Sequence, residues 1–456
     1  MSLTSIIRTA CGKDVKKIGF FGFGKSNKAI ADILFRENPN YTFTYRSSEK
    51  SEIPQFFSKE LRYNENKAFE NITEDVIFMS PSVRRSSDFI ASTKRAGCTL
   101  LSDAELFFLS EPRRVIAITG SDGKSTVTYL TAKLTEKTLS APPSGNFGLP
   151  LVSLIANGEC SGAVVELSSF QLQYMTPRVN RALITNISEN HLNWHSDFNE
   201  YIQAKKNIFT NAKLRAITLD DTVCKKIAKE FQPDIIISSE HSALELNRLY
   251  KPEIAVTLEN GSISVNGNPY IKTDDIFLKE SYNIKNFMSA IALSFELTEK
   301  SNIISLAKTF HGLPHRKEFF AKHRGVSFIN SSIDSTPSRT AKTLSTLDMP
   351  LVVIVGGSSK NLSYEPLIRA LSESARAVVL TGETAPKLYE LLNELKDFEP
   401  TVYYEPDFNS AVTLSAKIAK PGEAVILSPA HTSYDRFSNF EERGELFKNI
   451  INEITK

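Results

Sequence analysis

Short runs of apolar residues recur along the chain between longer stretches that look helical, and most of the runs lead into Gly, Ser, Thr or Asn. Parallel strands that helices cover on both faces are buried at nearly every position, so they appear as continuous apolar runs rather than as alternating patterns. The pattern therefore predicts an α/β protein with several parallel sheets. The runs are Ile18–Phe21, Val76–Met79, Val115–Ile118, Ala163–Val165, Ala182–Ile184, Leu351–Val355, Ala377–Leu380 and Ala424–Leu427.

The pattern changes between residues 234 and 282, where short apolar segments alternate with turn signals such as Glu259-Asn-Gly261 and Asn266-Gly-Asn-Pro269. Such spacing predicts an antiparallel patch within or beside the second domain. The 456 residues suit about three domains at roughly 150 residues each. We expect the boundaries after Ser110-Glu-Pro112 and near residue 299, which gives domains of residues 1–112, 113–298 and 299–456.

Charge and cysteine content narrow the possible environments. The 54 basic and 52 acidic residues give a net charge of +2 and are mixed along the chain, so neither nucleic-acid nor membrane-surface binding is expected. The four cysteines Cys11, Cys98, Cys160 and Cys224 lie far apart, which indicates neither a metal or redox pair nor a disulfide framework. No signal-peptide pattern and no apolar run of about 18 residues is evident. A reducing cytoplasm is the expected location.

The first glycine loop begins at Gly19 and runs through Gly22, Gly24 and Lys25 to Asn27. It resembles part of a dinucleotide fingerprint, but Asn27 stands where a third glycine is usual. The strand Tyr41–Tyr45 is followed by Arg46-Ser47 and not by an acidic residue for a ribose, which argues against NAD. Two interpretations remain: a tight turn without a ligand, and a helix N-terminus that binds an anionic group such as a diphosphate.

The second loop is Gly-Ser-Asp-Gly-Lys-Ser-Thr, from Gly120 to Thr126, directly after an apolar run. A nucleotide P-loop usually has a glycine five residues before Gly123, but that residue is Ile118. Even so, the glycines allow backbone N–H groups to face phosphate oxygens, Lys124 supplies a positive charge, and the Ser125 hydroxyl can join a Mg²⁺ shell. The loop indicates ATP or GTP binding.

Three further segments hold candidate residues for the chemistry. Glu166 ends an apolar run, where it could bind the same Mg²⁺ as Ser125 or could serve as a helix cap or salt-bridge partner, and the segment alone leaves these alternatives near even. His191 and His195 are four residues apart and could share a helix face, but zinc is disfavoured because no third ligand is evident. Lys205 and Lys206 have the composition of a solvated helix face.

Together these segments resemble the Mur ligase family over nearly the whole chain. The most discriminating ones are Glu-Leu-Ser-Ser-Phe-Gln-Leu from Glu166 and Ser-Asn-Phe-Glu-Glu-Arg-Gly from Ser438. The others are Gly22–Ser26, Leu101–Phe107, Ile118–Thr126, Gly145–Pro150, the segment around His191, Ala204-Lys205, Asn283–Asn286, Gly312–Arg316 and Leu427–Glu441. The shortened phosphate loop is the form typical of this family.

The resemblance implies three domains: a Rossmann-like N-terminal domain, a central P-loop ATPase domain with a mainly parallel sheet, and a Rossmann-like C-terminal domain. It implies a ligase of peptidoglycan precursor synthesis that uses ATP, two Mg²⁺ ions, UDP-N-acetylmuramoyl-L-alanine and D-glutamate, and that forms an acyl phosphate before the amide. Lys124, Glu166, His191 and Lys205 would be catalytic. Ser125 and Glu166 would hold one Mg²⁺, and His191 would hold the other with Lys205, which carries a carbamate derived from CO₂.

The resemblance also implies three groups of binding residues. ATP would contact Gly120, Ser121, Asp122, Gly123, Lys124, Ser125, Thr126, Asn283, Asn286 and Arg316. The UDP substrate would contact Gly22, Gly24, Lys25, Ser26, Arg46, Ser47, Ser82, Asn146 and Ser168. D-glutamate would contact Ser335, Lys360, Ser433, Tyr434 and Phe440. Because these residues come from all three domains, closure of the third domain over the central one is expected in a monomeric enzyme.

Five positions depart from the family pattern: Asn190, Tyr282, Ser331, Ile333 and Asp334. Ser331 lacks a carboxylate expected near the nucleotide ribose. A shared phosphate loop alone would also suit a folylpolyglutamate synthetase or another Mur enzyme, but the segment from Glu166 and the C-terminal Asn-Phe-Glu favour the D-glutamate ligation. A non-catalytic relative is the third hypothesis. It is disfavoured because Lys124, Glu166, His191 and Lys205 are all present.

Overall fold

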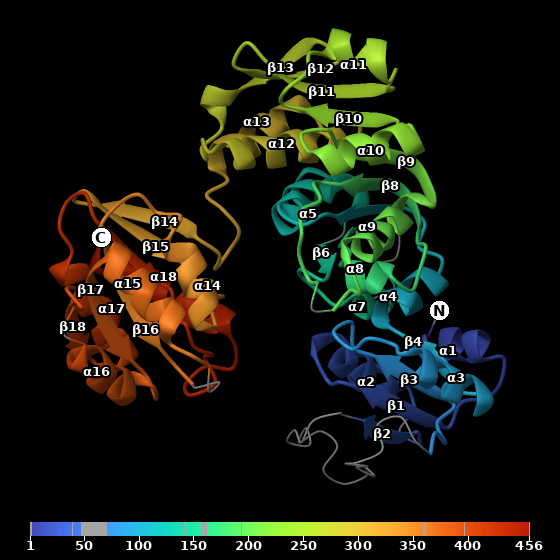
Figure 1. The fold of residues 1–456 in the computed structure, drawn as a ribbon, viewed down its shortest axis with the longest axis horizontal. Helices are drawn as coiled ribbons and strands as arrows, with labels where there is room; N and C mark the ends of the chain where they lie inside the picture. The colour runs from blue at the N-terminus through green and yellow to red at the C-terminus, as the bar shows by residue number, and fades with distance from the viewer. Residues whose placement is uncertain are drawn as a thin grey trace. The chain divides into compact units, whose positions relative to one another are not determined.

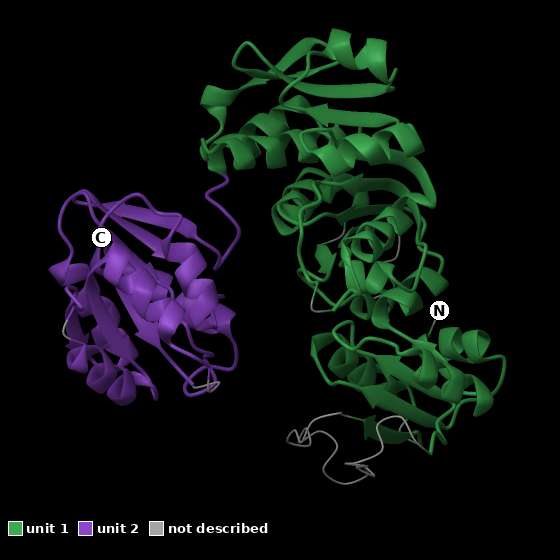
Figure 2. Ribbon diagram, viewed as in Figure 1, with its two compact units in different colours: residues 1–309 green, residues 310–456 purple. Residues whose placement is uncertain are grey.

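The computed structural model divides the chain into two compact units, residues 1–309 and residues 310–456 (Figures 1 and 2). Unit 1 holds the sheets of the first two predicted domains, and unit 2 holds the sheet of the third. The three-domain boundaries stay a prediction. The structure describes residues 2–38, 40–46, 71–140, 142–156, 158, 162–192, 194–358, 362–395 and 397–455.

The first sheet of unit 1 is parallel and has the strand order β2-β1-β3-β4 among the described residues. Its strands are β1 (Lys17–Phe21), β2 (Thr42–Arg46), β3 (Val76–Met79) and β4 (Thr99–Leu101). The helices of this part of the chain are α1 (Leu3–Cys11), α2 (Lys25–Glu37), α3 (Ser87–Arg95) and α4 (Asp103–Leu109).

The second sheet of unit 1 has the order β13-β12-β11-β10-β9-β8-β5-β7-β6 within the described residues. Its strands are β5 (Val115–Thr119), β6 (Pro143–Gly145), β7 (Ala163–Glu166), β8 (Arg178–Ile184), β9 (Asn211–Thr218), β10 (Ile235–Ser238), β11 (Ile254–Glu259), β12 (Ser262–Val265) and β13 (Asn268–Lys272). Its helices are α5 (Lys124–Leu134), α6 (Glu136–Leu139), α7 (Leu151–Ala156), α8 (Ser169–Leu172), α9 (Phe198–Lys206), α10 (Thr222–Phe231), α11 (Ala243–Leu249), α12 (Ser281–Ser294) and α13 (Lys300–Thr309), with 3-10 turns at Asn207–Phe209 and Thr273–Asp275. In the spatial order of the sheet, every neighbouring pair of strands from β11 through β5 to β6 is parallel.

The sheet of unit 2 has the order β14-β15-β19-β16-β17-β18 in the part of the chain that the structure describes. Its strands are β14 (Glu318–His323), β15 (Val326–Asn330), β16 (Leu351–Gly356), β17 (Ala375–Thr381), β18 (Thr401–Tyr404) and β19 (Ala424–Leu427). Its helices are α14 (Pro337–Leu344), α15 (Glu365–Ser374), α16 (Ala385–Glu394), α17 (Phe408–Ile418) and α18 (Phe440–Ile454). Only the edge strand β14 pairs antiparallel among these described strands.

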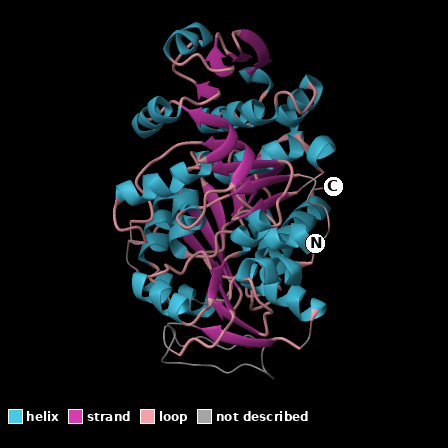
Figure 3. Cartoon of the chain, turned by 90° about the vertical axis from the view of Figure 1, so that its right-hand side faces the viewer, coloured by secondary structure: helices cyan, strands magenta, loops and turns pink. Residues whose placement is uncertain are grey.

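The predicted α/β class is confirmed, and all eight apolar runs lie within parallel strands. Helices lie on both sides of the strands (Figure 3), which explains why these strands lack alternation. The prediction of an antiparallel patch from residue 234 is wrong at its start, because β10 and β11 pair in parallel on either side of α11. The antiparallel pairs are β11–β12 and β12–β13, which turn at the predicted Asn-Gly signals.

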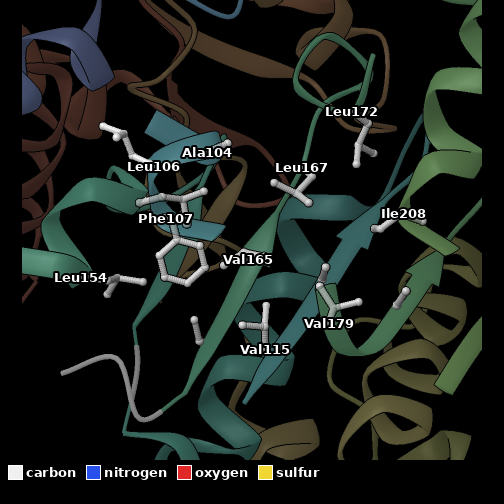
Figure 4. Packing of buried hydrophobic residues seen from close by; sticks show 14 of the residues in the cluster. Ala104, Leu106, Phe107, Val115, Leu154, Val165, Leu167, Leu172, Val179 and Ile208 are labelled. Atoms are coloured by element: carbon white, nitrogen blue, oxygen red, sulfur yellow. The ribbon is translucent and has the colours of Figure 1, made fainter. Parts of the chain in front are cut away.

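One continuous apolar core joins the two sheets of unit 1. Phe107 of α4 and Leu154 of α7 belong to the same buried cluster as Val165 of β7, and Figure 4 labels all three. The cluster also includes Phe20 of β1, so the packing extends from the N-terminal sheet into the central one. This shared core is the physical reason why residues 1–309 form one unit. None of the described helices combines the length and apolar character needed to cross a membrane.

Candidate active site

The phosphate loop follows β5 and leads into α5. Gly120 has φ +149° and Gly123 has φ +79°, which an L side chain rarely adopts. A Cβ on Gly120 would lie 1.9 Å from Thr185 Oγ1, and one on Gly123 would lie 2.5 Å from Asn286 Oδ1. Both glycines are therefore required by conformation and by space. The loop ends at the N-terminus of α5, where backbone N–H groups and the helix dipole favour an anion.

Residues at the end of β8 hold this loop in place. Thr185 Oγ1 donates to the Asp122 carbonyl at 2.7 Å, and Asn186 Oδ1 accepts from the Asp122 N–H at 2.9 Å. Ser121 Oγ contacts Tyr201 Oη at 2.9 Å. The sequence pattern assigned a role to Ser121 but none to Thr185, Asn186 or Tyr201. Thr185 and Asn186 directly follow the apolar run Ala182–Ile184, so their place at a strand end was the available signal.

Glu166 ends β7 and its side chain is 1% exposed. Its Oε2 accepts from the Ser125 hydroxyl at 2.7 Å, and its Oε1 accepts from the Asn146 amide at 2.7 Å. This geometry does not support a helix-capping role, because both carboxylate oxygens accept from side chains, one from Ser125 in the first turn of α5 and the other from Asn146 after β6. Glu166 thus lies between the phosphate loop and the loop after β6.

Lys205 lies on α9 and is buried, with 2% of its surface exposed. The interpretation as a solvated helix face is wrong for this residue. Its Nζ donates to the Gly120 carbonyl at 2.6 Å, beneath the phosphate loop, and lies 4.7 Å from the centre of the Tyr201 ring. Burial, followed by the positive charge of Lys124, lowers the pKa of Lys205 well below its ordinary value, against the opposing effect of Glu166. This environment favours the neutral amine.

His191 and His195 lie in an irregular segment, not on one helix face. His191 has φ +56° and packs its ring edge-on against Phe170, with the centroids 4.9 Å apart. Partial burial, and then the charges of Lys205 and Lys124, lower the pKa of His191. His195 is buried with its Nε2 2.9 Å from Ser169 Oγ. The two histidines therefore have different surroundings.

The donor set suits Mg²⁺ better than a transition metal. Within the described residues no three His, Cys, Asp or Glu side chains cluster as a ready metal site. The arrangement instead offers the Ser125 hydroxyl and the Glu166 carboxylate, which are hard oxygen donors already 2.7 Å apart. A carboxylate and a hydroxyl beside a phosphate loop fit a cation that also binds phosphate oxygens.

A cavity of about 180 Å³ opens beside this site. It brings together residues after β1, after β3 and after β6, which are far apart in the sequence. Four of the residues predicted to contact the UDP substrate line it, namely Gly24, Lys25, Ser26 and Asn146. The lining residues are Gly24, Lys25, Ser26, Asn27, Ser80, Pro81, Gly145, Asn146, Pro150 and Gln171.

Three other predicted UDP-substrate residues lie around the cavity. Gly22 adjoins the lining residue Ser80, because a Cβ on Gly22 would lie 2.9 Å from Ser80 Cβ. Ser82 Oγ lies 3.1 Å from Ser80 Oγ. Ser168 caps α8 in a capping box with Gln171. Ser47 lies outside the described residues.

Asn27, which replaces the third glycine of the first loop, is 1% exposed. Its amide donates to the Gly22 carbonyl at 2.7 Å and to the Phe78 carbonyl at 3.1 Å. The Asn27 side chain therefore connects the ends of β1 and β3. The glycine that a dinucleotide fingerprint has at this position would only allow the helix and the strand to pack closely. The connection through Asn27 is the physical reason why the partial fingerprint still forms an ordered turn.

Arg46 lies at the end of β2, and its guanidinium is buried in the part of unit 1 that holds the N-terminal sheet. Its Nε and Nη2 donate to the two carboxylate oxygens of Glu74 at 2.8 and 2.7 Å. The two side chains are 2% and 1% exposed. A contact between Arg46 and UDP stays a prediction, whereas its pairing with Glu74 is a feature of the fold.

Replacing Arg46 with methionine is therefore expected to destabilise unit 1 by about 3–5 kcal/mol, because Glu74 would be left buried without its partner. Urea unfolding of the variant measures this change. Lys133→Met, which removes one partner of the exposed Lys133–Glu136 pair, should change the stability by less than about 1 kcal/mol. An Arg46→Met variant that unfolds like the wild type but binds UDP weakly would contradict the structural role.

The predicted nucleotide residues on α12 flank the phosphate loop. Asn286 faces Gly123, and Asn283 is buried with its amide donating to Glu280 at 2.9 Å. The neighbouring Tyr282, one of the departures, is 53% exposed. Arg316 lies in unit 2.

The predicted D-glutamate residues lie in unit 2, except that Lys360 is outside the described residues. Ser335 follows β15, and Ser433 and Tyr434 follow β19, its parallel neighbour. Tyr434 is 73% exposed, whereas Ser433 is buried. Phe440 begins α18, and its carbonyl accepts from Ser332 Oγ at 2.8 Å. The loops thus meet at the carboxyl edge of the sheet, where ligands of α/β proteins bind.

Arg443 of α18 fastens these loops together and is buried. Its guanidinium donates to the carbonyls of Ser332 at 2.9 Å, His431 at 3.1 Å and Thr432 at 3.2 Å. Burial lowers the pKa of Arg443 to about 10. Arg443 belongs to the family-like segment from Ser438, but the sequence pattern gives it no role.

Ser331 and Asp334, two of the positions that depart from the family pattern, lie in different surroundings in unit 2. Ser331 Oγ accepts from the Lys317 N–H at 3.2 Å. Asp334 is buried, and its Oδ2 accepts from Ser428 Oγ at 2.8 Å. Burial raises the pKa of Asp334. The added carboxylate at residue 334 therefore belongs to the interior of unit 2.

The comparisons with known proteins all indicate the same family. The family model described as the Mur ligase middle domain matches residues 118–294, and the one described as the Mur ligase, glutamate ligase domain matches residues 315–431. The UDP-N-acetylmuramoylalanine–D-glutamate ligase of Acetivibrio thermocellus is 34% identical over 96% of this chain and 97% of its own length. The protein of the same name from Clostridium novyi is 33% identical, with the same two shares.

Solved structures resemble the fold at lower sequence identity. The UDP-N-acetylmuramate-alanine ligase MurC of Thermotoga maritima has a TM-score of 0.52 and 18% identity, covering 96% of this chain and 99% of its own. A MurF structure from Acinetobacter baumannii has a TM-score of 0.53 and 15% identity, covering 98% of each chain. The resemblance found in the sequence is confirmed: the chain belongs to the Mur ligase family.

Proposed function

We propose that the protein is an ATP-dependent ligase that joins D-glutamate to UDP-N-acetylmuramoyl-L-alanine during peptidoglycan precursor synthesis. The observation that carries the proposal is the position of Glu166. One of its oxygens bonds to Ser125 of the phosphate loop, and the other bonds to Asn146 of the cavity lining. A phosphoryl group held by the loop and a carboxylate at the end of a substrate in the cavity would meet at this residue. The two relatives that are named for this reaction match this chain over 97% of their own lengths, and this match supports the choice of substrates.

The reaction has two steps. A carboxylate oxygen of the L-alanyl group attacks the γ-phosphorus of ATP, the bond from that phosphorus to the β,γ-bridging oxygen breaks, and ADP leaves. The amine of D-glutamate then attacks the acyl carbon, inorganic phosphate departs and the nitrogen loses a proton to solvent. Activation is needed because a carboxylate is a poor acyl donor, whereas phosphate is a good leaving group.

The chain's own residues position and neutralise the charges of the first step. Lys124 at the start of α5 and the N–H groups of the loop bind phosphate oxygens. Ser125 and Glu166 would hold one Mg²⁺, and His191 and carbamylated Lys205 would hold a second. When bound, the ions supply electrostatic stabilisation of the oxygens that surround the transferring phosphoryl group.

The surroundings of Lys205 support the carbamate. A neutral amine is the form that reacts with CO₂, and burial favours that form here. The nitrogen forms a bond to the carbon of CO₂ and loses a proton, while one C=O electron pair moves to oxygen. The side chain thereby changes from a neutral amine into an anionic oxygen donor beneath the phosphate loop, near the carbonyl of Gly120.

D-glutamate binds at the carboxyl edge of the unit 2 sheet, through Ser335, Lys360, Ser433, Tyr434 and Phe440. Closure of unit 2 over the ATP-bound central sheet, with Arg316 reaching the nucleotide, completes the site. The protein acts as a cytoplasmic monomer on soluble substrates, without nucleic-acid or membrane partners.

A phosphate-release assay with ATP, Mg²⁺, UDP-N-acetylmuramoyl-L-alanine and a panel of amino acids tests the proposal. We expect phosphate release to require D-glutamate and to be negligible with L-glutamate, since the acceptor loops must recognise one configuration. Mass spectrometry of the product should show one added glutamyl residue. Equal turnover with L-glutamate, or turnover only with a folate acceptor, would exclude the proposed reaction.

A further inference from the structure

The loop after β3 and the segment before α9 belong to different sheets of unit 1, yet they are bonded directly. Arg84 Nη1 donates to the Trp194 carbonyl at 2.9 Å, and its Nη2 donates to the two oxygens of Glu200 at 2.9 and 3.2 Å. In the opposite direction, Trp194 Nε1 donates to the Ser82 carbonyl at 3.1 Å. We refer to Arg84, Trp194 and Glu200 as the Arg84 bridge.

One end of the Arg84 bridge leads to the cavity. Ser82 Oγ lies 3.1 Å from Ser80 Oγ, and Ser80 and Pro81 line the cavity. The chain from residue 80 to residue 84 is short, so Ser80 belongs to the same loop that is bonded to Trp194 on one side and to Glu200 on the other.

The other end leads to His191. The backbone N–H groups of Trp194 and His195 both donate to the His191 carbonyl at 3.0 Å. The Trp194 ring packs against Phe170 with centroids 4.4 Å apart, and Phe170 in turn contacts the His191 ring. His191 has a left-handed backbone in an irregular segment, so its place depends on these tertiary contacts.

Glu200 connects the bridge to α9, the helix that carries Lys205. It accepts from the Ser196 N–H at 2.6 Å and from the Gln173 amide at 3.2 Å, in addition to Arg84. Arg84 lies 5.7 Å from the Trp194 ring centre, which adds a cation–π contact to its hydrogen bonds. The bridge therefore joins the cavity loop to both elements that carry the predicted second metal site.

We propose that the Arg84 bridge couples occupancy of the UDP-substrate cavity to the position of His191, and so to the binding of the Mg²⁺-nucleotide. Arg84 and Glu200 are positioning residues in this arrangement, and the inference rests on the proposed function for the identity of the ligands. By thermodynamic linkage the coupling works in both directions: the UDP substrate tightens the nucleotide, and the nucleotide tightens the UDP substrate by the same factor.

Trp194 is the only tryptophan of the chain, so intrinsic fluorescence reports on the bridge directly. Titration of the full-length protein with UDP-N-acetylmuramoyl-L-alanine should change the tryptophan emission. Calorimetric titration with Mg²⁺-ADP, with and without the saturating UDP substrate, then measures the coupling. For the wild type we expect the Kd of Mg²⁺-ADP to fall at least about fivefold when the UDP substrate is present.

Arg84→Met keeps most of the side-chain length but removes the guanidinium, and it should reduce this ratio to less than about twofold. Arg84→Lys keeps the charge without the forked geometry and should give an intermediate ratio. The matched control is Lys225→Met, which removes one partner of the exposed Lys225–Glu240 pair in the same unit. It should leave the wild-type ratio unchanged.

The outcomes separate the inference from the proposed function. Binding of the UDP substrate to the wild type without any effect on the Kd of Mg²⁺-ADP would overturn the coupling alone. A full wild-type ratio in folded Arg84→Met, judged by an unchanged melting temperature, would overturn the role of the bridge. Absence of UDP-substrate binding to the wild type would overturn the proposed function and the coupling with it.

Discussion

Replacing Lys205 with alanine is expected to reduce kcat by about 10²–10³-fold, the usual effect of removing one group that stabilises transition-state charge. The side chain is buried beneath the phosphate loop, where its carbamate would be an anionic metal ligand. The alanine variant lacks the amine on which the proposed carbamate would form, so the proposed second Mg²⁺ would lose a ligand. Steady-state phosphate release at saturating substrates measures the loss.

Added short carboxylates should restore part of this activity, because a carboxylate can occupy the space of the missing carbamate and supply a similar oxygen donor. Lys206→Ala is the matched control: it removes the neighbouring lysine, which pairs with Glu230 at 2.6 Å, and should keep nearly full activity. Incorporation of ¹³CO₂ followed by NMR should give a carbamate signal in the wild type that Lys205→Ala lacks. A folded Lys205→Ala variant with wild-type kcat would refute the assignment.

The strands were predictable from the sequence because burial on both faces removes alternation. Val115–Ile118 and Leu351–Val355, for example, are apolar at every position, and the structure buries all of them. The start of the antiparallel patch was not predictable in the same way. β10 and β11 are as short and apolar as hairpin strands, and only the intervening helix α11 makes their parallel pairing possible.

The candidate site was partly predictable because its residues follow strands. Glu166 ends β7 and the phosphate loop follows β5. These strands are parallel neighbours, so the meeting of the two features at one sheet edge follows from the topology. Lys205 is different. Its local sequence has the composition of an exposed helix, and its burial results from the phosphate loop and Tyr201 packing around it. Only the family resemblance singled it out.

Side-chain contacts between segments far apart in the sequence could not be predicted from the local sequence. Arg46 was placed at a strand end correctly, but nothing near it in the sequence indicates Glu74, which lies 28 residues away and satisfies both donors of its fork. The Arg84–Glu200 contact joins residues 116 positions apart. Such contacts depend on how two sheets pack, which periodicity and turn chemistry do not determine.

Replacing Glu166 with glutamine is expected to reduce the rate of the first step by about 10²–10³-fold. The amide keeps the shape and one oxygen, but it removes the negative charge that would hold Mg²⁺ beside Ser125. In a single-turnover experiment without D-glutamate, the wild type should form ADP and acyl phosphate rapidly. The Glu166→Gln variant should form ADP slowly at any Mg²⁺ concentration that leaves the ATP fully complexed.

The melting temperature of the Glu166→Gln variant distinguishes a slower first step from misfolding. Glu166 is buried, and replacing a buried carboxylate by a neutral isostere removes a desolvation cost, so the melting temperature should stay near or above the wild-type value. Glu136→Gln, at an exposed acid at the start of α6, should form ADP at the wild-type rate. Rapid ADP formation by Glu166→Gln combined with slow amide formation would mean that Glu166 acts on the acceptor step. In that case its bond to Ser125 would serve only to order the phosphate loop, and another residue would have to hold the first Mg²⁺.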